Sequence, residues 1–215
     1  MGIDTLGLRE SKKQETRQLI SDHATRLFME QGFEQTTITE IATAARVAKK
    51  TVTNYFPRKE DLALDHHEEF TASLARAVTD RAAGESALAA LRREFNTALE
   101  EHNAVAGFAG PEFARMIADS PTLTARLRDL HDQREEALAV ALADGAPPAT
   151  PAIAPRAAAA LLAAAHRLLF RRIQELTLAG HPNDRIAATV APEAAHVFDL
   201  LAASLGDFPT AAPIR

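Results

Sequence analysis

The sequence has no cysteine, no tryptophan and a single tyrosine, Tyr55. Without cysteine it can form neither disulfide bonds nor thiolate metal sites. It also has no run of about 18 apolar residues, which predicts that it does not span a membrane. Its first residues are polar and charged and lack the apolar centre of a signal peptide, so we expect a cytoplasmic protein.

Local signatures of enzymes are missing as well. The sequence has no glycine-rich phosphate loop and no nucleophile elbow, so we expect no catalytic residues, no cofactor and no enzymatic activity. Among eight histidines, only His196 has the Glu-x-x-His spacing, with Glu193. A di-iron bundle needs two such motifs and further carboxylates, so we expect no metal site.

What the sequence does contain is typical of an all-α protein. Alanine, leucine, glutamate and arginine dominate, and apolar residues recur at helical spacing along most of the chain. Thr37 and Glu40 have the spacing of a capping box at the start of a helix, and Pro57 ends a later one. The expected helices cover about 12–31, 38–45, 48–55, 58–82, 85–102, 121–143, 156–179 and 193–205.

Positive charge is concentrated near the amino terminus. The net charge is +2 over residues 1–60 and −7 over residues 61–215, and all five lysines lie in the first part. The stretch 41–59 contains no acid and five cations: Arg46, Lys49, Lys50, Arg58 and Lys59. Its two short helices have the size of a helix-turn-helix unit, which places one helix in the major groove of DNA. Clustered cations favour this interpretation, because neutralising phosphates releases counterions.

Residues 14–64 contain an ordered set of motifs: Leu27-Phe28, Gly32-Phe33, Thr36-Thr37-Ile38, Ile41-Ala42, Ala45-x-Val47, Thr51-Val52-x-x-Tyr55-Phe56 and Lys59-Glu60-Asp61-Leu62. This ordered set resembles the motifs of the TetR family of one-component transcriptional repressors. The resemblance implies a three-helix DNA-binding domain over 12–57 and a helical ligand-binding and dimerisation domain over 58–206. It also implies a homodimeric repressor that binds a palindromic operator and is released by a small-molecule effector.

By position, the resemblance assigns eight residues to the DNA-binding surface: Thr37, Lys49, Lys50, Thr51, Thr53, Asn54, Tyr55 and Lys59. Thr51, Tyr55 and Lys59 match positions that contact phosphate. The Asn54 amide could pair with adenine, whereas Lys50 could address either guanine or phosphate.

Two residues depart from the family pattern in this stretch. Arg46 stands where the family has glycine in the turn, and a left-handed backbone there costs a non-glycine residue about 1 kcal/mol. Ala48 stands where the family has serine or threonine as a helix cap, and the absence of a capping side chain costs about 1 kcal/mol. Arg46 could compensate through an added phosphate contact.

The rest of the chain offers candidates for a ligand cavity: Phe95, Phe108, Phe113, Met116, His131, His166, Phe170 and Arg171. Each phenylalanine could equally be part of the core. His166 and Arg171 are more specific, because a buried cation in an apolar helix needs a partner, which could be Glu175 or an anionic group of a ligand.

The resemblance further implies that the last two long helices pack against their copies as a four-helix bundle. The residues that we expect there are Leu168, Leu169, Ile173, Val197 and Leu201. The alternative function is a small-molecule binding protein or an all-α enzyme in which the helix-turn-helix unit is only structural. The sequence determines neither the ligand nor the operator, nor whether the effector induces or co-represses.

Overall fold

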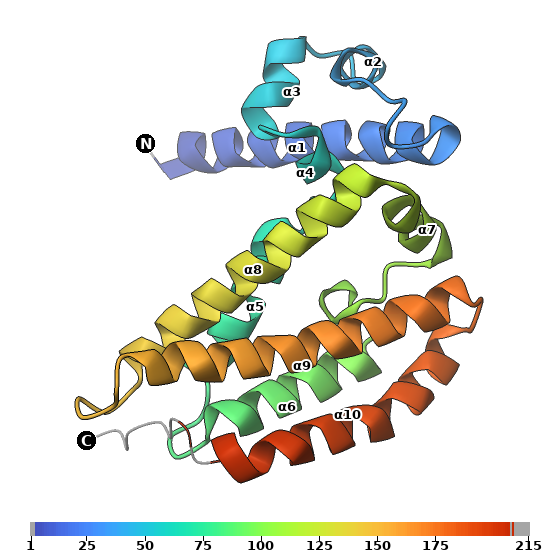
Figure 1. Ribbon diagram of the computed structural model, residues 1–215. Coiled ribbons are helices and arrows are strands. Elements are labelled where there is room, and N and C mark those ends of the chain that lie inside the picture. The colour runs from blue at the N-terminus through green and yellow to red at the C-terminus, as the bar shows by residue number, and fades with distance from the viewer. Residues whose placement is uncertain (1–2, 207, 209–215) are drawn as a thin grey trace. The chain divides into compact units, whose positions relative to one another are not determined.

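The computed structural model describes residues 3–206 and 208, with side chains from Ser11 onward. The part of the chain so described consists of helices and connections, without a strand, which confirms the predicted all-α class (Figure 1). The elements are α1 (Ile3–Gln31), α2 (Ile38–Ala44), α3 (Lys49–Tyr55), α4 (Lys59–Ala63), α5 (His67–Thr79), α6 (Ala87–Glu100), the 3₁₀ turn η1 (Ala104–Ala106), α7 (Pro111–Asp119), α8 (Pro121–Asp144), α9 (Ile153–Leu178) and α10 (Asn183–Leu205).

The chain divides into two compact units. The first unit comprises the chain up to His67 together with Arg115–Arg126, and the second comprises Glu68–Ala114 and the chain from Leu127 onward. The division therefore falls within α7 and α8. Each unit has its own apolar core.

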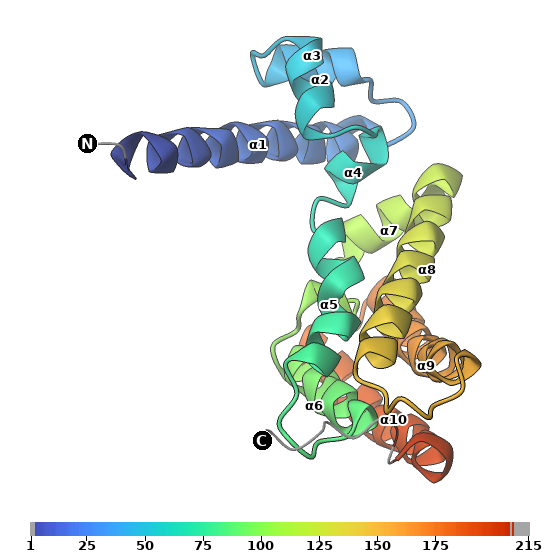
Figure 2. The same ribbon diagram turned by 90° about the vertical axis from the view of Figure 1, so that its left-hand side faces the viewer.

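In the first unit α1 supplies one side of the core through Ile20, Ala24 and Phe28, which are completely or almost completely buried. Their spacing places them on one face of the helix. Phe28 contacts Phe33 with ring centroids 5.0 Å apart, and the short helix α4 packs against α1 (Figure 2). This packing holds the α2–α3 pair on a rigid support.

The expected single helix over 58–82 is wrong, because the chain leaves the helical conformation between α4 and α5. The reason lies in α1. Ser21 donates its hydroxyl to the Asp65 carboxylate at 2.6 Å, and Arg17 donates to the Asp65 carbonyl oxygen at 3.3 Å. A carbonyl bonded in this way is turned out of the helix, and aspartate is in any case a poor residue for a helix interior.

Residues 115–126 join the first unit through two polar contacts. Arg126 and Asp61 form an ion pair with an N–O distance of 2.9 Å, and both side chains are at most 10% exposed. Ser120 donates to the Glu34 carboxylate at 2.5 Å, and this bond is the main reason that the pKa of Glu34 lies below its usual value. Both contacts join segments more than 60 residues apart in the sequence.

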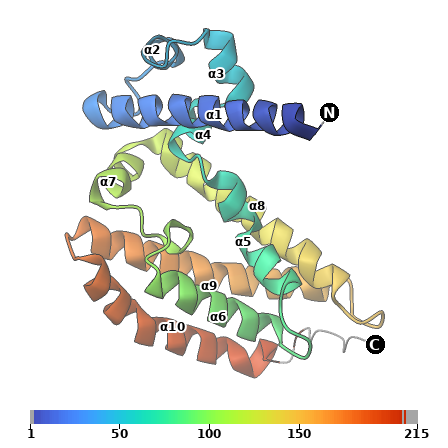
Figure 3. The same ribbon diagram turned by 180° about the vertical axis from the view of Figure 1, so that it is seen from behind.

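In the second unit α6, α9 and α10 pack side by side around the main core (Figure 3). The expected last helix over 193–205 is too short, because α10 begins at Asn183 and continues through Pro192. A proline in a helix removes one backbone hydrogen bond. Val190, Ala194 and Phe198 on the same helix are fully buried, so packing of this apolar face keeps the helix continuous past Pro192.

Helices α9 and α10 are long and apolar enough, by length and composition, to cross a membrane. This is weak evidence, because a core helix of a soluble protein has the same composition. Half of the apolar window of α9 and 22% of that of α10 are buried within the protein.

Candidate DNA-binding surface and cavity

The helix-turn-helix unit begins with a complete capping box. The Glu40 amide donates to the Thr37 hydroxyl oxygen at 3.2 Å, and the Thr37 amide donates to the Glu40 carboxylate at 2.8 Å. These bonds satisfy amides that the first helical turn leaves unpaired. They also lower the pKa of Glu40. The start of α2 is therefore determined by its own sequence, as predicted.

The turn between α2 and α3 contains the strained residue that the sequence indicated. Arg46 has a φ of 54°, in the left-handed region. Its amide donates to the Thr43 carbonyl at 3.1 Å, and the Val47 amide donates to the Ala42 carbonyl at 3.0 Å. At Ala48 the backbone is extended and no side chain caps α3. Both departures are thus present in the folded protein, and both lower its stability.

Helix α3 has one buried face and one exposed face. Val52 is fully buried, and Phe56, at the helix end, is 1% exposed. Lys49, Lys50 and Asn54 are exposed, whereas Thr51, Thr53 and Tyr55 are half-buried. The Thr53 hydroxyl donates to the Lys50 carbonyl at 3.1 Å and is engaged within its own helix. The residues assigned to DNA contact thus lie on the surface of α3, and their contact with DNA stays a prediction.

Lys59, at the start of α4, has several partners within the first unit. Its ammonium donates to the carbonyl oxygens of Phe33 at 2.8 Å and Thr36 at 3.1 Å, and it lies 4.2 Å from the centre of the Phe33 ring. These contacts hold the turn after α1 against α4. The phosphate contact predicted for Lys59 stays a prediction, and the observed contacts identify a structural role for the same ammonium group.

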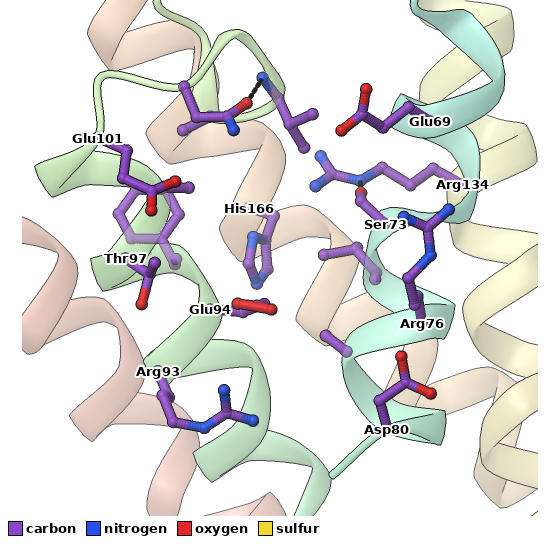
Figure 4. Close-up of a pocket in the computed structure, with 17 residues that line it drawn as sticks. Glu69, Ser73, Arg76, Asp80, Arg93, Glu94, Thr97, Glu101, Arg134 and His166 are labelled. Carbon is purple, nitrogen blue, oxygen red and sulfur yellow. Dashed lines mark hydrogen bonds between the residues drawn. The ribbon is translucent and has the colours of Figure 1, made fainter.

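The second unit contains a cavity of about 340 Å³ lined by residues of α5, α6, α8, α9 and η1, together with Asn103 (Figure 4). Phe95, Leu74 and Ala77 form part of an apolar wall. Arg134 and His166 also line the cavity, and each is only 5% exposed. Exposed charged residues surround them: Glu69, Arg76, Asp80, Arg93, Glu94 and Glu101.

Arg134 is a buried cation. Its Nε donates to the Ser73 hydroxyl oxygen at 2.9 Å, and its guanidinium carbon lies 4.5 Å from the centre of the Phe70 ring. Burial lowers the pKa of Arg134 to about 9, so the group remains charged at neutral pH. The recorded partners are a neutral hydroxyl and an aromatic ring, and neither neutralises the charge.

His166 contacts the rings of Phe95 and Phe198, at centroid distances of 5.7 Å and 5.5 Å. Its Nε2 atom is buried and has no hydrogen-bond partner in the described part of the chain. Burial, with a contribution from the nearby Arg134 charge, lowers the pKa of His166 to about 3. The imidazole is therefore neutral at physiological pH, and leaving its nitrogen unpaired costs about 1–3 kcal/mol.

The structure brings together only part of the predicted ligand set. Phe95 and His166 line the cavity. His131 and Phe170 are buried and make a T-shaped ring contact, with centroids 5.2 Å apart. Phe108 is buried against His102, Phe113 is half-buried, and Met116 belongs to the first unit. The interpretation of Arg171 as a buried cation is wrong, because the residue is exposed.

Sequence reasoning missed Arg134, which is the buried cation of this unit. A signal was present, since Arg134 follows Leu130 by four residues and precedes Leu138 by four. Both leucines are buried, so the arginine occupies the apolar face of α8.

The predicted dimer contact is wrong at Leu169 and Ile173, because neither side chain lies on the surface. Leu169 is 1% exposed and Ile173 is fully buried in the core of the second unit. Leu168 is 50% exposed, and Val197 and Leu201 are half-buried. The spacing predicted an apolar helix correctly, but it did not distinguish the face that packs inward from the face left outside. Glu193 accepts hydrogen bonds from Arg172 at 3.0 Å, 3.1 Å and 3.3 Å.

The fold and the exposed α3 define a helix-turn-helix protein with an all-helical second unit. Residues 20–65 match the family model described as bacterial regulatory proteins, tetR family. The chain is also 31% identical over 138 residues to the HTH-type transcriptional regulator TcmR of Streptomyces glaucescens, a match over 62% of this chain and 61% of TcmR. The chain is therefore similar to the TetR family of transcriptional regulators, most directly in its helix-turn-helix unit. The aligned region spans about three fifths of TcmR.

Solved structures agree on the fold. NalD, the secondary repressor of the MexAB-OprM multidrug efflux pump in Pseudomonas aeruginosa, has a TM-score of 0.51 at 18% identity, over 87% of this chain and 97% of NalD. A TetR-family regulator of Streptomyces coelicolor A3 has a TM-score of 0.52 at 19% identity, over 86% and 96%. The SmeT–triclosan complex has a TM-score of 0.50 at 18% identity, over 93% and 100%. At these identities the likeness concerns the fold alone.

Proposed function

We propose that this protein is a homodimeric, cytoplasmic repressor that binds a palindromic DNA operator and is released by a small-molecule effector. The observation that carries the proposal is the exposed face of α3, where Lys49, Lys50 and Asn54 lie beside Arg46 in an acid-free stretch. A dimer would place two such helices in successive major grooves, about 34–36 Å apart along the operator.

The α3 residues have different roles in this proposal. Lys49 and Lys50 neutralise phosphates, which supplies affinity with little sequence preference. Asn54 provides base recognition, because an amide can donate to and accept from adenine. Thr51 and Tyr55, both half-buried, offer hydroxyl groups to the DNA backbone.

Dimerisation in this proposal uses the exposed apolar side chains of α9 and α10. Leu161 and Leu168 on α9 and Leu200 on α10 are between 48% and 65% exposed. Apolar residues of this kind on two adjacent helices are typical of a protein interface when they form one patch. Leu168 was predicted from the sequence to lie in the dimer contact, and it is exposed in the structure.

The oligomeric state tests this surface. Leu168→Glu should convert the dimer to a monomer, as measured by light scattering after gel filtration. Val140→Glu is the matched control, because Val140 on α8 is 54% exposed and lies outside α9 and α10. A monomeric wild-type protein, or a dimer that survives Leu168→Glu, would contradict the proposed interface.

The cavity of the second unit is the proposed effector site. SmeT, which shares the fold, has been crystallised with triclosan, and a cavity of about 340 Å³ is at the small end of the range of about 300–1,000 Å³ for small-molecule sites. An effector releases DNA only if it binds the two states of the dimer unequally. A coupling of about 1–3 kcal/mol would weaken DNA binding about 5–150-fold.

DNA binding is tested by fluorescence anisotropy on duplexes from the DNA upstream of the coding sequence. Lys49→Ala should weaken binding to all duplexes and reduce the salt slope by about one. Asn54→Ala should reduce preference among duplexes more than it reduces non-specific affinity. Lys12→Ala, an exposed lysine of α1 outside the α2–α3 pair, is the control. If the dimer binds no duplex at low salt, the alternative of a small-molecule binding protein or enzyme is favoured.

A further inference from the structure

The polar interior of the cavity indicates the chemistry of its occupant. The apolar wall formed by Leu74, Ala77 and Phe95 excludes water from one side. A buried guanidinium from α8 and a buried imidazole from α9, the latter in contact with the Phe95 ring, supply the polar part of the lining. In Figure 4 the guanidinium end of Arg134 and the ring of His166 occupy the middle of the site, with the carboxylates of Glu69, Glu94 and Asp80 around them.

Arg134 can donate further hydrogen bonds to a ligand in this cavity. Its Nε is used by Ser73 at 2.9 Å, and the Ser73 hydroxyl itself donates to the Phe70 carbonyl at 2.8 Å. Ser73 is therefore held in place as an acceptor and orients the guanidinium. The two terminal nitrogens form the pair of parallel donors that matches a carboxylate, and no carboxylate bonded to them is recorded among the described residues.

His166 adds a second, independent observation. Its Nε2 is buried, has no partner in the described structure and belongs to a residue that lines the cavity. A neutral imidazole carries one donor and one acceptor. An oxygen atom held by Arg134 could therefore also receive a hydrogen bond from His166.

The charged residues at the cavity edge do not reverse the preference of Arg134 for an anionic ligand. Glu69, Asp80, Glu94 and Glu101 are exposed, so water and salt screen their fields. Arg134 is 5% exposed, where a charge acts through a lower effective dielectric. The buried guanidinium of Arg134 therefore favours a negatively charged group inside the cavity.

We infer that the effector is a small organic anion, with an aromatic or apolar body and a carboxylate that Arg134 binds and His166 orients. The inference rests on the proposed effector site of the preceding section. The carboxylate lies at the guanidinium of Arg134, and the body packs against Phe95 and Leu74. Each good hydrogen bond between a charged pair strengthens binding about 10- to 100-fold.

Paired compounds test the inference on the wild-type dimer. The probes are 2-naphthoate with 2-naphthamide and indole-3-acetate with indole-3-acetamide, and in each pair a neutral NH₂ group replaces one oxygen of the carboxylate. Isothermal titration calorimetry should detect binding of at least one carboxylate in the low millimolar range or below, with its amide at least about tenfold weaker. Equal affinities within both pairs, or no binding by either carboxylate, would overturn the inference.

Variants locate the site. Arg134→Gln should weaken carboxylate binding about 10- to 100-fold and bring the acid and its amide to similar affinities. Arg128→Gln is the matched control, because Arg128 is an exposed arginine on the same helix. His166→Phe should weaken both members of a pair by a similar factor. If Arg134→Gln fails to fold, the comparison of acid with amide on the wild-type protein still decides the question.

DNA binding is measured separately on the same samples. If a carboxylate binds at Arg134 but the dimer binds no duplex, the repressor function is wrong and the chemical class of the ligand stands. If the dimer binds DNA and is released equally by the acid and its amide, with Arg134→Gln behaving as wild type, the repressor function stands and the anion inference is wrong.

Discussion

His166→Phe tests whether burial keeps the histidines of the second unit neutral. In the unfolded chain a histidine titrates near about 6.5, whereas burial lowers the pKa of His166 and of His131 to about 3. Near the His131 ring, the charges of Arg134, Arg167 and Arg171 add to the effect. Between these two values the unfolded chain binds protons that the folded protein does not.

The sign follows from this difference. The contribution of each histidine to the free energy of unfolding is complete above about pH 6.5 and is lost progressively as the pH falls toward about 3. The slope is about 1.4 kcal/mol per pH unit for each group inside that window. Between about pH 7.5 and about pH 5.0, His166 alone therefore accounts for a loss of about 2 kcal/mol.

Urea denaturation at fixed protein concentration measures this loss, since the stability of a dimer depends on concentration. Wild type should lose about 2 kcal/mol more than His166→Phe over that interval, and a double variant with His131→Phe should lose still less. His66→Phe is the matched control, because the His66 side chain is 76% exposed and lies outside α9 and α10. The reasoning is refuted if wild type and His166→Phe lose stability in parallel.

Three further changes test local features of the first unit by urea denaturation. Arg46→Gly should stabilise the protein by about 1 kcal/mol, because glycine adopts the φ of 54° without steric cost, and its salt slope for DNA should fall by about one if Arg46 contacts phosphate. Ala48→Ser should add about 1 kcal/mol by capping α3, an idea that unchanged stability would reject. Asp61→Ala should cost about 3–5 kcal/mol, because it leaves the Arg126 charge buried and unpaired. Asp22→Ala, at an exposed position of α1, should cost far less.

The sequence alone determined the local structure of the α2–α3 pair. The Thr37–Glu40 capping box and the left-handed Arg46 were predicted and are present, as is the missing side-chain cap at Ala48. These features depend on residues no more than four positions apart, so short-range hydrogen bonds and backbone sterics decide them. The all-α class also follows from the sequence, because helical periodicity is a local property of the chain.

Tertiary structure decided the features that depend on contacts between residues far apart in the sequence. The break between α4 and α5 arises because Ser21, 44 residues earlier, bonds Asp65. Leu169 and Ile173 were assigned to the outside of α9 but are buried within the unit, because periodicity reveals an apolar face and not which neighbour covers it. The burial of Arg134 against Phe70 has the same origin. Only the packing of α5, α6, α8 and α9 places the buried Arg134 near His166, whose Nε2 has no hydrogen-bond partner in the described part of the chain.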